Sequence, residues 1–343
     1  MRVNINDIAR KCHVSIATVS RVLNNKGPVK ESTRLKVLEV AQQMDFKLNP
    51  IARGLSRKRT DTIGVILPEL VDEFFMNIIQ GLDEVASIYH RYLMISSSHS
   101  QRNDVETILE FMSSGRVDGV VLMAPSMEEE VYDTIKRSKR PLVLLNCFMN
   151  HDEFVRIGID NYSSARNMVR HLVEHGYERI GMIKGPDTNV EAQLRYKGFI
   201  DELKAHSIPI RNEDIVSGDF TLRSGFHGFM RLMEQTDRVR AIFMANDMMA
   251  IGAYKAANQA QIRISQDVAI IGFDNIFSSS VVKPRLTTVH IPVVELGRRA
   301  GEYMIKMIDG HIDSKQPYRE YLSTGLVIGG SCGCADSEGQ RVF

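Results

Sequence analysis

The stretch from Asn4 to Asn24 constrains the fold more than any other part of this sequence. Its pattern predicts two short helices joined by a tight turn. Asn4 is a favoured N-cap residue, and Asp7, three positions later, completes an arrangement like a capping box. Ser15 can cap the second helix in the same way, and that helix is expected to run to about Asn24. Two helices joined in this manner are typical of a helix-turn-helix DNA reader.

Apolar residues supply a packed side for this unit. Val19, Val22 and Leu23 suit the inner face of the second helix, which Gly27 and Pro28 bring to an end. A third helix is expected from about Ser32, with its buried side formed by Leu35, Leu38, Val40, Ala41 and Met44.

The charge of the chain is divided unevenly. Residues 1–60 hold 13 of the 43 basic residues and 4 of the 42 acidic ones, which gives this segment a net charge of +9 and leaves −8 for the remainder. Concentrated positive charge favours a polyanionic partner, because neutralising phosphates releases condensed counterions. We therefore expect double-stranded DNA as the partner of the N-terminal segment.

Several classes of protein are excluded by what the sequence lacks. No run approaches the ~18 apolar residues that a membrane span needs, and the start is unlike a signal peptide. The four cysteines form no disulfide framework. These features predict a cytoplasmic protein with no membrane partner.

The second predicted helix carries the residues expected to contact DNA. Only the major groove offers a unique pattern of donors and acceptors. Arg21 can donate to a guanine edge, and Ile16 and Ala17 can meet thymine methyl groups. Short polar side chains suit phosphate oxygens, which position a protein without specifying sequence. The phosphate-contacting and capping residues in this set are Asn4, Ser15, Thr18, Ser20, Asn24 and Thr33.

Two segments resemble a known family. Residues 14–24 look like the recognition segment of the LacI/GalR family of repressors, and residues 49–56, Asn-Pro-Ile-Ala-Arg-Gly-Leu-Ser, resemble its hinge helix. The resemblance implies that two such hinge helices pair across a homodimer and insert Leu55, with Ala52 beside it, into the minor groove. Arg57 is then placed to touch phosphates. Eight residues are too few to form a stable helix alone, so we expect this segment to fold on DNA.

From Asp61 onward, short β-rich runs alternate with amphipathic helices, which is typical of parallel sheets with right-handed crossovers. The resemblance implies an α/β body like a periplasmic sugar-binding protein.

The expected fold is therefore an all-α helix-turn-helix headpiece plus two doubly wound parallel-sheet subdomains. The expected strands cover residues 63–67, 92–97, 117–123, 141–146, 179–184, 241–246 and 268–272. The expected domains are a headpiece (1–48), a hinge (49–60) and a body (61–343), with subdomains at 61–160 plus 292–323 and 161–291 plus 324–343.

Ligands of such sheets bind outside the carboxyl ends of the strands. Polar and aromatic residues at these ends, together with the family's motifs, imply that an effector contacts Asn146, Arg195, Phe220, Asn246 and Asp274. Phe74 and Phe75 are expected at the opposite edge of the site. They follow Asp72 and Glu73 where the family usually has Asn-Pro, so this edge departs from the family's pattern.

The expected function is a transcriptional regulator, a repressor of carbohydrate-metabolism genes that a sugar or sugar phosphate controls. The sequence has no Gly-rich phosphate loop and no nucleophile elbow, which argues against an enzyme and against a cofactor. Cys332 and Cys334 have no further thiol or histidine close in sequence, so no metal site is expected there. The short polar tail from Cys334 to Phe343 favours a homodimer, because it lacks the leucine heptads with which the lactose repressor forms tetramers.

Three alternatives remain open. One is a catabolite-control regulator of the same family that a phosphorylated carrier protein drives. Against it, Val294 and Glu302 stand where a tyrosine and an arginine are expected to meet the phosphoserine, and Glu302 would repel a phosphate. The second is a purine-responsive repressor, because an arginine and an aromatic ring suit a base as well as a sugar. A sugar-binding protein without a role in gene regulation is the third, and it would need no basic N-terminal unit.

Overall fold

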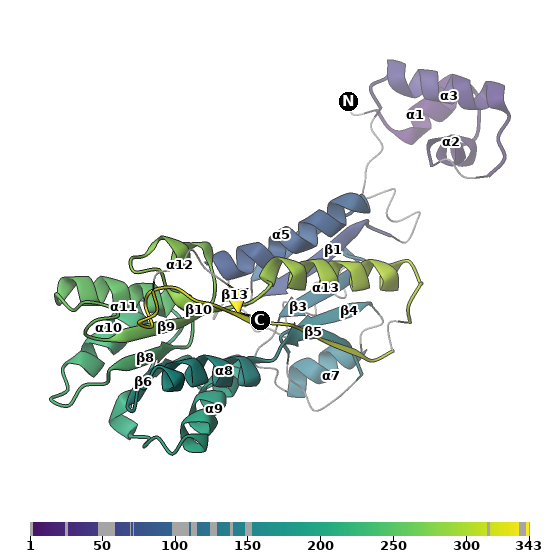
Figure 1. Cartoon of the computed structure of the whole chain (residues 1–343). Coiled ribbons are helices and arrows are strands. Elements are labelled where there is room, and N and C mark those ends of the chain that lie inside the picture. The colour runs from purple at the N-terminus through teal and green to yellow at the C-terminus, as the bar shows by residue number, and fades with distance from the viewer. Residues whose placement is uncertain are drawn as a thin grey trace.

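The computed structural model describes residues 3–24, 27–46, 59–68, 70, 72–97, 110, 115–123, 129–137, 140–147, 153–313, 316–335 and 341–342. Figure 1 shows a small helical headpiece and a larger body of helices and sheets. Within the described ranges, no helix combines the length and the apolar character that crossing a membrane requires.

Side-chain caps define the start of the first two headpiece helices. The headpiece consists of α1 (Ile5–Cys12), α2 (Ile16–Leu23) and α3 (Glu31–Gln43). The Asn4 side chain accepts hydrogen bonds from the amides of Asn6 and Asp7, and the Asp7 carboxylate accepts one from the amide of Asn4. Ser15 Oγ accepts from the amide of Thr18 at 3.2 Å. Both predicted caps are present, and they fix the turn between the helices.

The headpiece core departs from the prediction in α3. The core comprises Ile8, Ala9, Cys12, Val19, Val22, Val37, Val40 and Ala41. Leu35 and Leu38, which were expected in it, are 59% and 45% exposed. Successive residues of a helix are about 100° apart, so Val37, Val40 and Ala41 share one face and Leu35 lies opposite. The predicted set combined residues from two faces.

The first sheet of the body is entirely parallel. Its strand order is β11-β5-β4-β3-β1-β2. The bounds are β1 (Thr62–Leu67), β2 (Tyr92–Ser97), β3 (Gly119–Met123), β4 (Leu142–Leu145), β5 (Val155–Ile159) and β11 (Tyr318–Leu322). The helices against it are α5 (Glu73–Ile88), α7 (Glu129–Arg137) and α13 (Val293–Ile308).

Alternate residues of these strands belong to two separate cores. Val65 and Val121 pack with residues of α5 and α13, whereas Ile66 and Val120 pack with Ile135 of α7. This period of two places α5 and α13 on one face of the sheet and α7 on the other, as Figure 1 shows. Burial on both faces explains why the central strands are almost wholly apolar.

The second sheet has the order β13-β12-β10-β9-β8-β6-β7 and is parallel except for the pairs that involve β12. Its strands are β6 (Ile180–Lys184), β7 (Ile215–Ser217), β8 (Ala241–Met244), β9 (Ala269–Asp274), β10 (Thr287–His290), β12 (Gly325–Val327) and β13 (Arg341–Val342). The pair α8 (Asn161–Glu174) and α9 (Val190–Ala205) covers one face, and α10 (Leu222–Met233) with α11 (Asp247–Gln259) covers the other (Figure 1). A 3₁₀ turn (Asn212–Asp214) precedes β7, and the short α12 (Phe277–Val281) follows β9.

The chain passes between the two sheets three times. It leaves the first sheet after β5 for α8, returns after β10 into α13, and leaves again after β11 for β12. The prediction of a helical headpiece and two doubly wound parallel-sheet subdomains is confirmed. Each of the seven predicted strands is present, with its ends within two residues of the expected positions.

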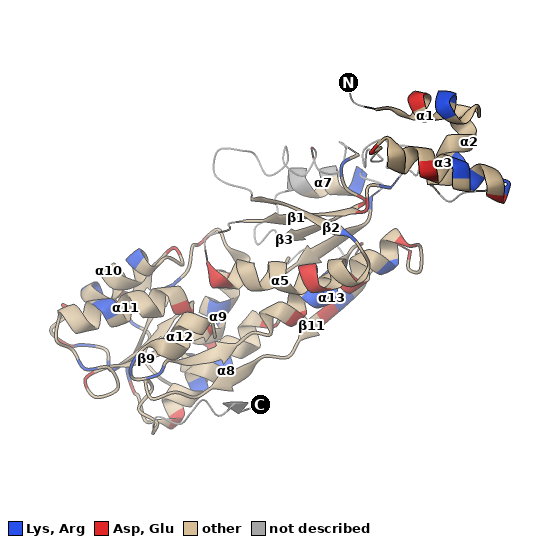
Figure 2. Ribbon diagram, turned by 90° about the horizontal axis from the view of Figure 1, so that it is seen from above, with Lys and Arg blue, Asp and Glu red and all other residues tan. Residues whose placement is uncertain are grey.

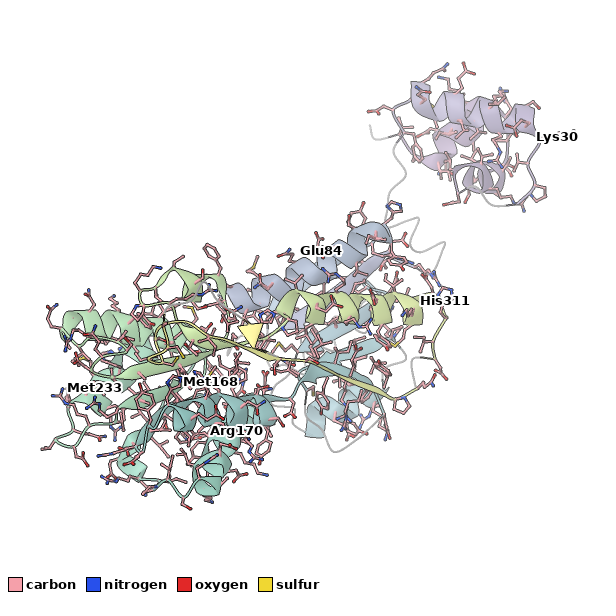
Figure 3. The ribbon with its side chains drawn as sticks, in the orientation of Figure 1. Lys30, Glu84, Met168, Arg170, Met233 and His311 are labelled. Atoms are coloured by element: carbon pink, nitrogen blue, oxygen red, sulfur yellow. The ribbon has the colours of Figure 1, made fainter. Side chains whose placement is uncertain are left out.

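The returning helix α13 is held tightly to α5. A Cβ atom on Gly81 would lie 2.0 Å from the carbonyl oxygen of Val294, and one on Gly297 would lie 2.2 Å from that of Ile78. The two glycines therefore let the helix backbones touch. In Figure 2, α5 carries acidic residues and α13 carries both acidic and basic ones. Glu84 of α5, labelled in Figure 3, pairs with Arg298 of α13 at 2.7 Å.

Candidate DNA-reading face and effector cavity

The outward side of α2 carries the side chains that were expected to read bases. Ile16 is 51% exposed, and Ala17 and Arg21 are also exposed. Arg21 follows Ala17 by one helical turn, so the two share a stripe of the surface. Among the described residues of the headpiece, other basic side chains lie on α1 and α3, with acidic ones among them (Figure 2).

The short polar residues differ in how free their side chains are. The hydroxyls of Ser15 and Thr18 lie 2.9 Å apart and bond to each other. Asn24 is only 8% exposed, and its amide donates to the carbonyl oxygen of Ser20 at 2.9 Å. The expectation of an accessible donor is therefore not met at Asn24, because this residue caps the end of α2. Asn4 is exposed and Thr33 is half-buried. The hinge residues Ala52, Leu55 and Arg57 lie outside the described residues.

A cavity of about 250 Å³ lies between the two sheets of the body. Its walls come from the carboxyl ends of strands in both subdomains, the position where open α/β sheets bind ligands. The first subdomain contributes Pro68, Asp72, Phe74, Phe75 and Met123. The second contributes Pro186, Thr188, Asn189, Glu191, Arg195, Asp219, Phe220, Thr221, Asn246 and Asp274.

Arg195 is buried in the wall of this cavity and is held by several contacts. It is 4% exposed, donates from Nε to Asn161 at 2.8 Å, and donates from Nη1 to the carbonyl oxygen of Ala245 at 2.6 Å. Its guanidinium lies 3.9 Å from the ring centroid of Phe273, in a cation–π contact. These contacts lock the guanidinium in place, so the edge that it presents to the cavity is fixed before any ligand arrives.

Two buried carboxyl groups face this arginine. Asp274 Oδ1 lies 3.4 Å from Arg195 Nη1, and Glu191 Oε1 lies 3.9 Å from Arg195 Nη2. Burial raises the pKa of Asp274 well above its ordinary value, and burial also raises the pKa of Glu191. Asp274 Oδ1 is buried and makes no hydrogen bond within the described structure. An oxygen of this kind is available to accept a hydrogen bond from a ligand.

Backbone strain concentrates at the same place. Asp274 has φ +115° and Phe220 has φ +67°, both outside the region that side-chain-bearing residues prefer. Asn246 supports Phe220 by donating from its amide to the Phe220 carbonyl oxygen at 3.0 Å, while its own oxygen caps α11. Asn246 thus lines the cavity mainly as a support. Gly185 leaves room for the Phe220 ring, because a Cβ there would lie 2.4 Å from it.

Aromatic rings come from both sides of the cavity. Phe220 and Phe75 are half-buried, whereas Phe74 is 8% exposed and stands edge-on to Phe75 with ring centroids 5.5 Å apart. Six of the seven predicted effector-contacting residues therefore line one cavity.

Asn146 is the exception. It is 1% exposed and lines a separate space of about 10 Å³ with Cys147 and Arg156. Neither polar atom of its side chain makes a hydrogen bond within the described structure. The backbone of Asn146, directly after β4, has φ +45°.

Glu191, Asp72 and Asp219 also line the cavity and were not predicted from the sequence. Glu191 precedes Arg195 by one turn of α9, and that spacing was available as a signal. Asp72 was noted only as a departure from the family's pattern. In the structure it caps α5 by accepting from the amide of Phe75 at 3.2 Å, and this holds the aromatic edge in place.

Two family models match this chain. Residues 4–49 match the model described as bacterial regulatory proteins of the lacI family, and residues 169–332 match a periplasmic binding protein-like domain. The first match covers the headpiece, and the second covers much of the cavity wall.

Curated relatives match over nearly the whole chain. Catabolite control protein A of Priestia megaterium is 34% identical over 311 residues, which are 90% of this chain and 93% of that protein. The transcriptional repressor CytR of Escherichia coli K12 is 32% identical over 329 residues, 95% of each chain. The regulator NtdR of Bacillus subtilis is 33% identical over 94% of this chain and 98% of its own length.

Solved structures show the same architecture. A lac repressor dimer bound to operator and an anti-inducer superposes with a TM-score of 0.84 and 25% identity, covering 97% of this chain and 99% of that one. A complex of the regulator CelR with cellobiose superposes with a TM-score of 0.73 and 24% identity, covering 96% and 100%. The likeness to CelR is a likeness of fold.

Proposed function

We propose a specific role for this chain, which belongs to the LacI family of DNA-binding transcriptional regulators and is not an enzyme. In this proposal it is a homodimer that represses carbohydrate-metabolism genes, and a small neutral effector controls it. The observation that carries the proposal is the cavity between the subdomains, whose arginine is held in place by hydrogen bonds and whose walls include carboxyl groups and aromatic rings. The same chain carries a headpiece with an exposed reading stripe.

The proposed DNA contacts divide into two kinds. Arg21, Ile16 and Ala17 read base edges in the major groove, because they are the exposed side chains on the outward stripe of α2. The phosphate contacts and the hinge contacts keep their sequence-based assignments: Asn4, Ser15, Thr18, Ser20, Asn24, Thr33, Ala52, Leu55 and Arg57. Among these, Asn24 is the weakest candidate because it is buried.

The charges around the cavity favour a neutral sugar over a sugar phosphate. Asp72, Glu191, Asp219 and Asp274 stand against one arginine among the described lining residues. Two donors of that arginine are already used by Asn161 and the Ala245 carbonyl group. A phosphate would therefore meet acidic side chains and an arginine that is already engaged, whereas sugar hydroxyls can exchange hydrogen bonds with the carboxyl groups and accept from Arg195. Phe220 and Phe75 suit the apolar face of a sugar ring.

The purine alternative is supported by the same aromatic residues, and the binding screen described below tests it with nucleosides.

The carrier-driven alternative rests on the likeness to catabolite control protein A. Against it, Glu302 lies on α13 at 3.2 Å from Arg299, and Arg299 is also paired with Glu320. The arginine nearest to this position is thus already neutralised. A carrier pull-down with measurable affinity at physiological salt would favour that alternative.

A homodimer is proposed through the body. On α12, Phe277 is 75% exposed and Val281 is 61% exposed, and large apolar side chains exposed to this degree suit a protein interface. A two-fold dimer places two headpieces on a near-palindromic operator. The proposed units are a headpiece at 1–48, a hinge at 49–60 and a body at 61–343. Effector binding changes the angle between the subdomains and so the presentation of the hinges.

Two measurements on the full chain test the proposal. Selection from a random pool of double-stranded oligonucleotides should yield a near-palindromic site. A thermal-shift screen of neutral sugars, sugar phosphates and nucleosides should show stabilisation by a neutral sugar, because a ligand of the native state raises the melting temperature by mass action. Stabilisation by sugar phosphates alone would contradict the proposed effector class, and a failure to select any sequence would contradict the regulator itself.

A further inference from the structure

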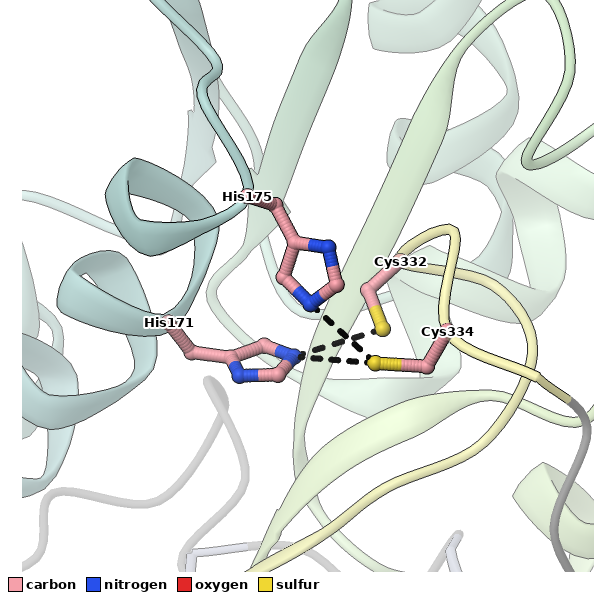
Figure 4. Close-up of side chains that lie close together, drawn as sticks. All are labelled: His171, His175, Cys332 and Cys334. Carbon is pink, nitrogen blue, oxygen red and sulfur yellow. Dashed lines mark hydrogen bonds between the residues drawn. The ribbon is translucent and has the colours of Figure 1, made fainter.

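Four metal-binding side chains converge away from the effector cavity. His171 and His175 come from the end of α8, and Cys332 and Cys334 come from the segment after β12. No metal site was predicted at the two cysteines, because no histidine is near them in sequence. Figure 4 shows that the fold brings two histidines to them. One ligand atom from each residue lies within 4.8 Å of the other three.

Local backbone geometry aims each pair of ligands at one point. His171 and His175 are four residues apart, so a helical turn places both rings on the same side of α8. The two cysteines are separated by Gly333, which has φ +98°. A Cβ atom at that position would lie 3.2 Å from the Tyr177 hydroxyl, so glycine suits both the turn and the space.

The distances between ligand atoms match those around a tetrahedral metal. His171 Nε2 lies 3.3 Å from Cys332 Sγ and 3.8 Å from Cys334 Sγ, and His175 Nε2 lies 3.1 Å from Cys334 Sγ. Zinc bonds of about 2.3 Å to sulfur and about 2.0 Å to nitrogen place tetrahedral N and S ligands about 3.6 Å apart. The ligands therefore need only small adjustments to close around an ion.

Surrounding groups hold Cys332 in position. The Thr287 hydroxyl donates to Cys332 Sγ at 3.1 Å, and the Tyr177 hydroxyl donates to the Cys332 carbonyl oxygen at 3.1 Å. Outer contacts of this kind orient ligands at metal sites. Cys332 is fully buried, but His175 is exposed, and His171 and Cys334 border an open cavity of about 330 Å³. An ion can therefore reach the cluster from solvent.

We propose that His171, His175, Cys332 and Cys334 bind one zinc ion. Two imidazoles and two thiolates in a tetrahedral arrangement are the ligands that zinc prefers among common divalent metals. Four protein ligands leave no open coordination position, so the site is structural and not catalytic. The ion joins the segment around residues 332–334 to α8. That segment follows β12, which enters the second subdomain directly after a crossover, so the ion stabilises this part of the fold.

The test uses full-length protein without a histidine tag, expressed in zinc-containing medium. Elemental analysis should find about one zinc per chain. Removal of the metal with a chelator should lower the melting temperature, and adding zinc back should restore it. Cobalt(II) in place of zinc should give the visible absorption of a tetrahedral site with thiolate ligands. No zinc in the purified protein, together with no cobalt spectrum after reduction of the thiols, would overturn the proposal.

Variants separate metal binding from the hydrogen bonds of the cluster. His175→Asn and Cys334→Ser should each weaken zinc binding by more than the roughly 10- to 100-fold that a lost outer-shell contact costs. His227→Asn, which changes an exposed histidine on another helix, should keep one zinc per chain. Circular dichroism checks that each variant is folded. The proposal is wrong if a folded Cys334→Ser variant holds zinc as tightly as the unchanged chain. It is also wrong if thiol counting shows that a Cys332–Cys334 disulfide persists in the presence of a reductant and excludes zinc.

Discussion

The carboxylate of Glu73 accepts a hydrogen bond from the backbone amide of Ser278 at 3.2 Å and a second one from the Ser278 hydroxyl. Glu73 begins α5 of the first subdomain, and Ser278 lies in α12 of the second. Asp72 and Phe74, on either side of Glu73, line the cavity. This contact therefore links the two subdomains at the edge of the effector site, and it favours the angle between them at which both walls face the same cavity.

We expect Glu73→Ala to weaken effector binding. A hydrogen bond to a charged group contributes about 1.5 to 3 kcal/mol, so the loss should raise the effector Kd by about 10- to 100-fold. Isothermal titration with a compound that stabilises the protein in the screen measures this. The matched control is Glu84→Ala on the same helix, because Glu84 pairs with Arg298 inside the first subdomain. Equal effector affinity in both variants would show that the contact does not affect the cavity.

Arg21→Ala should change which operators the protein prefers. A bidentate contact to one base contributes about 1 to 3 kcal/mol of discrimination, so preference at one position of each half-site should be lost. Repeating the oligonucleotide selection with the variant measures this. Arg10→Ala serves as the control, because Arg10 is an exposed arginine of α1 that pairs with Asp7 at 3.0 Å. Unchanged preference in the Arg21 variant would remove Arg21 from the reading set.

Phe220→Ala should impair effector binding and leave operator binding intact in the absence of effector. Loss of the ring removes stacking of about 0.5 to 1.5 kcal/mol in addition to its apolar contact area. Calorimetry for the effector and a gel shift for the operator measure the two properties separately. A variant that binds effector as well as the unchanged chain would place the ligand elsewhere in the cavity.

The raised pKa of Asp247 should make the stability of the fold depend on pH. It is fully buried, accepts from the Thr288 hydroxyl at 2.6 Å, and has its pKa raised to about 7 by burial. The folded state therefore holds a proton that the unfolded state has lost. The resulting stabilisation is complete below about pH 4 and disappears as the pH rises through about 7.

Asp247→Asn should flatten this decrease in melting temperature between about pH 4 and about pH 7. The raised pKa values of Glu191 and Asp274 act in the same direction, so part of the slope should remain. Asp267→Asn is the control, because the pKa of Asp267 is lowered to about 2 by its hydrogen bonds to Arg263 and it does not titrate in this range. An identical slope in both variants would show that Asp247 does not hold the proton.

Local signals predicted the parts of the fold that local interactions determine. The caps at Asn4 and Ser15 involve residues no more than three positions away, and both are present. The apolar runs of most central strands are equally visible in sequence, but β10, Thr-Thr-Val-His, is buried and was not predicted. Edge strands gave a weaker signal: β11, Tyr-Arg-Glu-Tyr-Leu, is polar and partly exposed, so nothing in its composition distinguishes it from a loop.

Features that depend on tertiary contacts were not predicted. Leu35 and Leu38 were predicted in the core because they are apolar. In the structure, the face of α3 that holds Val37 and Val40 packs in the core, and the two leucines lie outside that face. Asn146 follows the end of a strand as expected, but it lines a separate small space and not the cavity. The nearness of His171 to Cys332 joins residues 161 positions apart, and a single sequence contains no signal for it.

The most direct test of the whole account measures operator affinity of the full chain with and without effector. The operator is the site selected from the random pool, and fluorescence anisotropy at one fixed salt concentration gives the Kd. Coupling between the two sites should change that Kd by about 5- to 150-fold on saturation with effector. At an effector concentration that just saturates the unchanged chain, the change should be smaller in Phe220→Ala, because this variant binds less effector. An operator Kd that is the same with and without a saturating, stabilising ligand would contradict the claim that the cavity controls the DNA-reading headpiece.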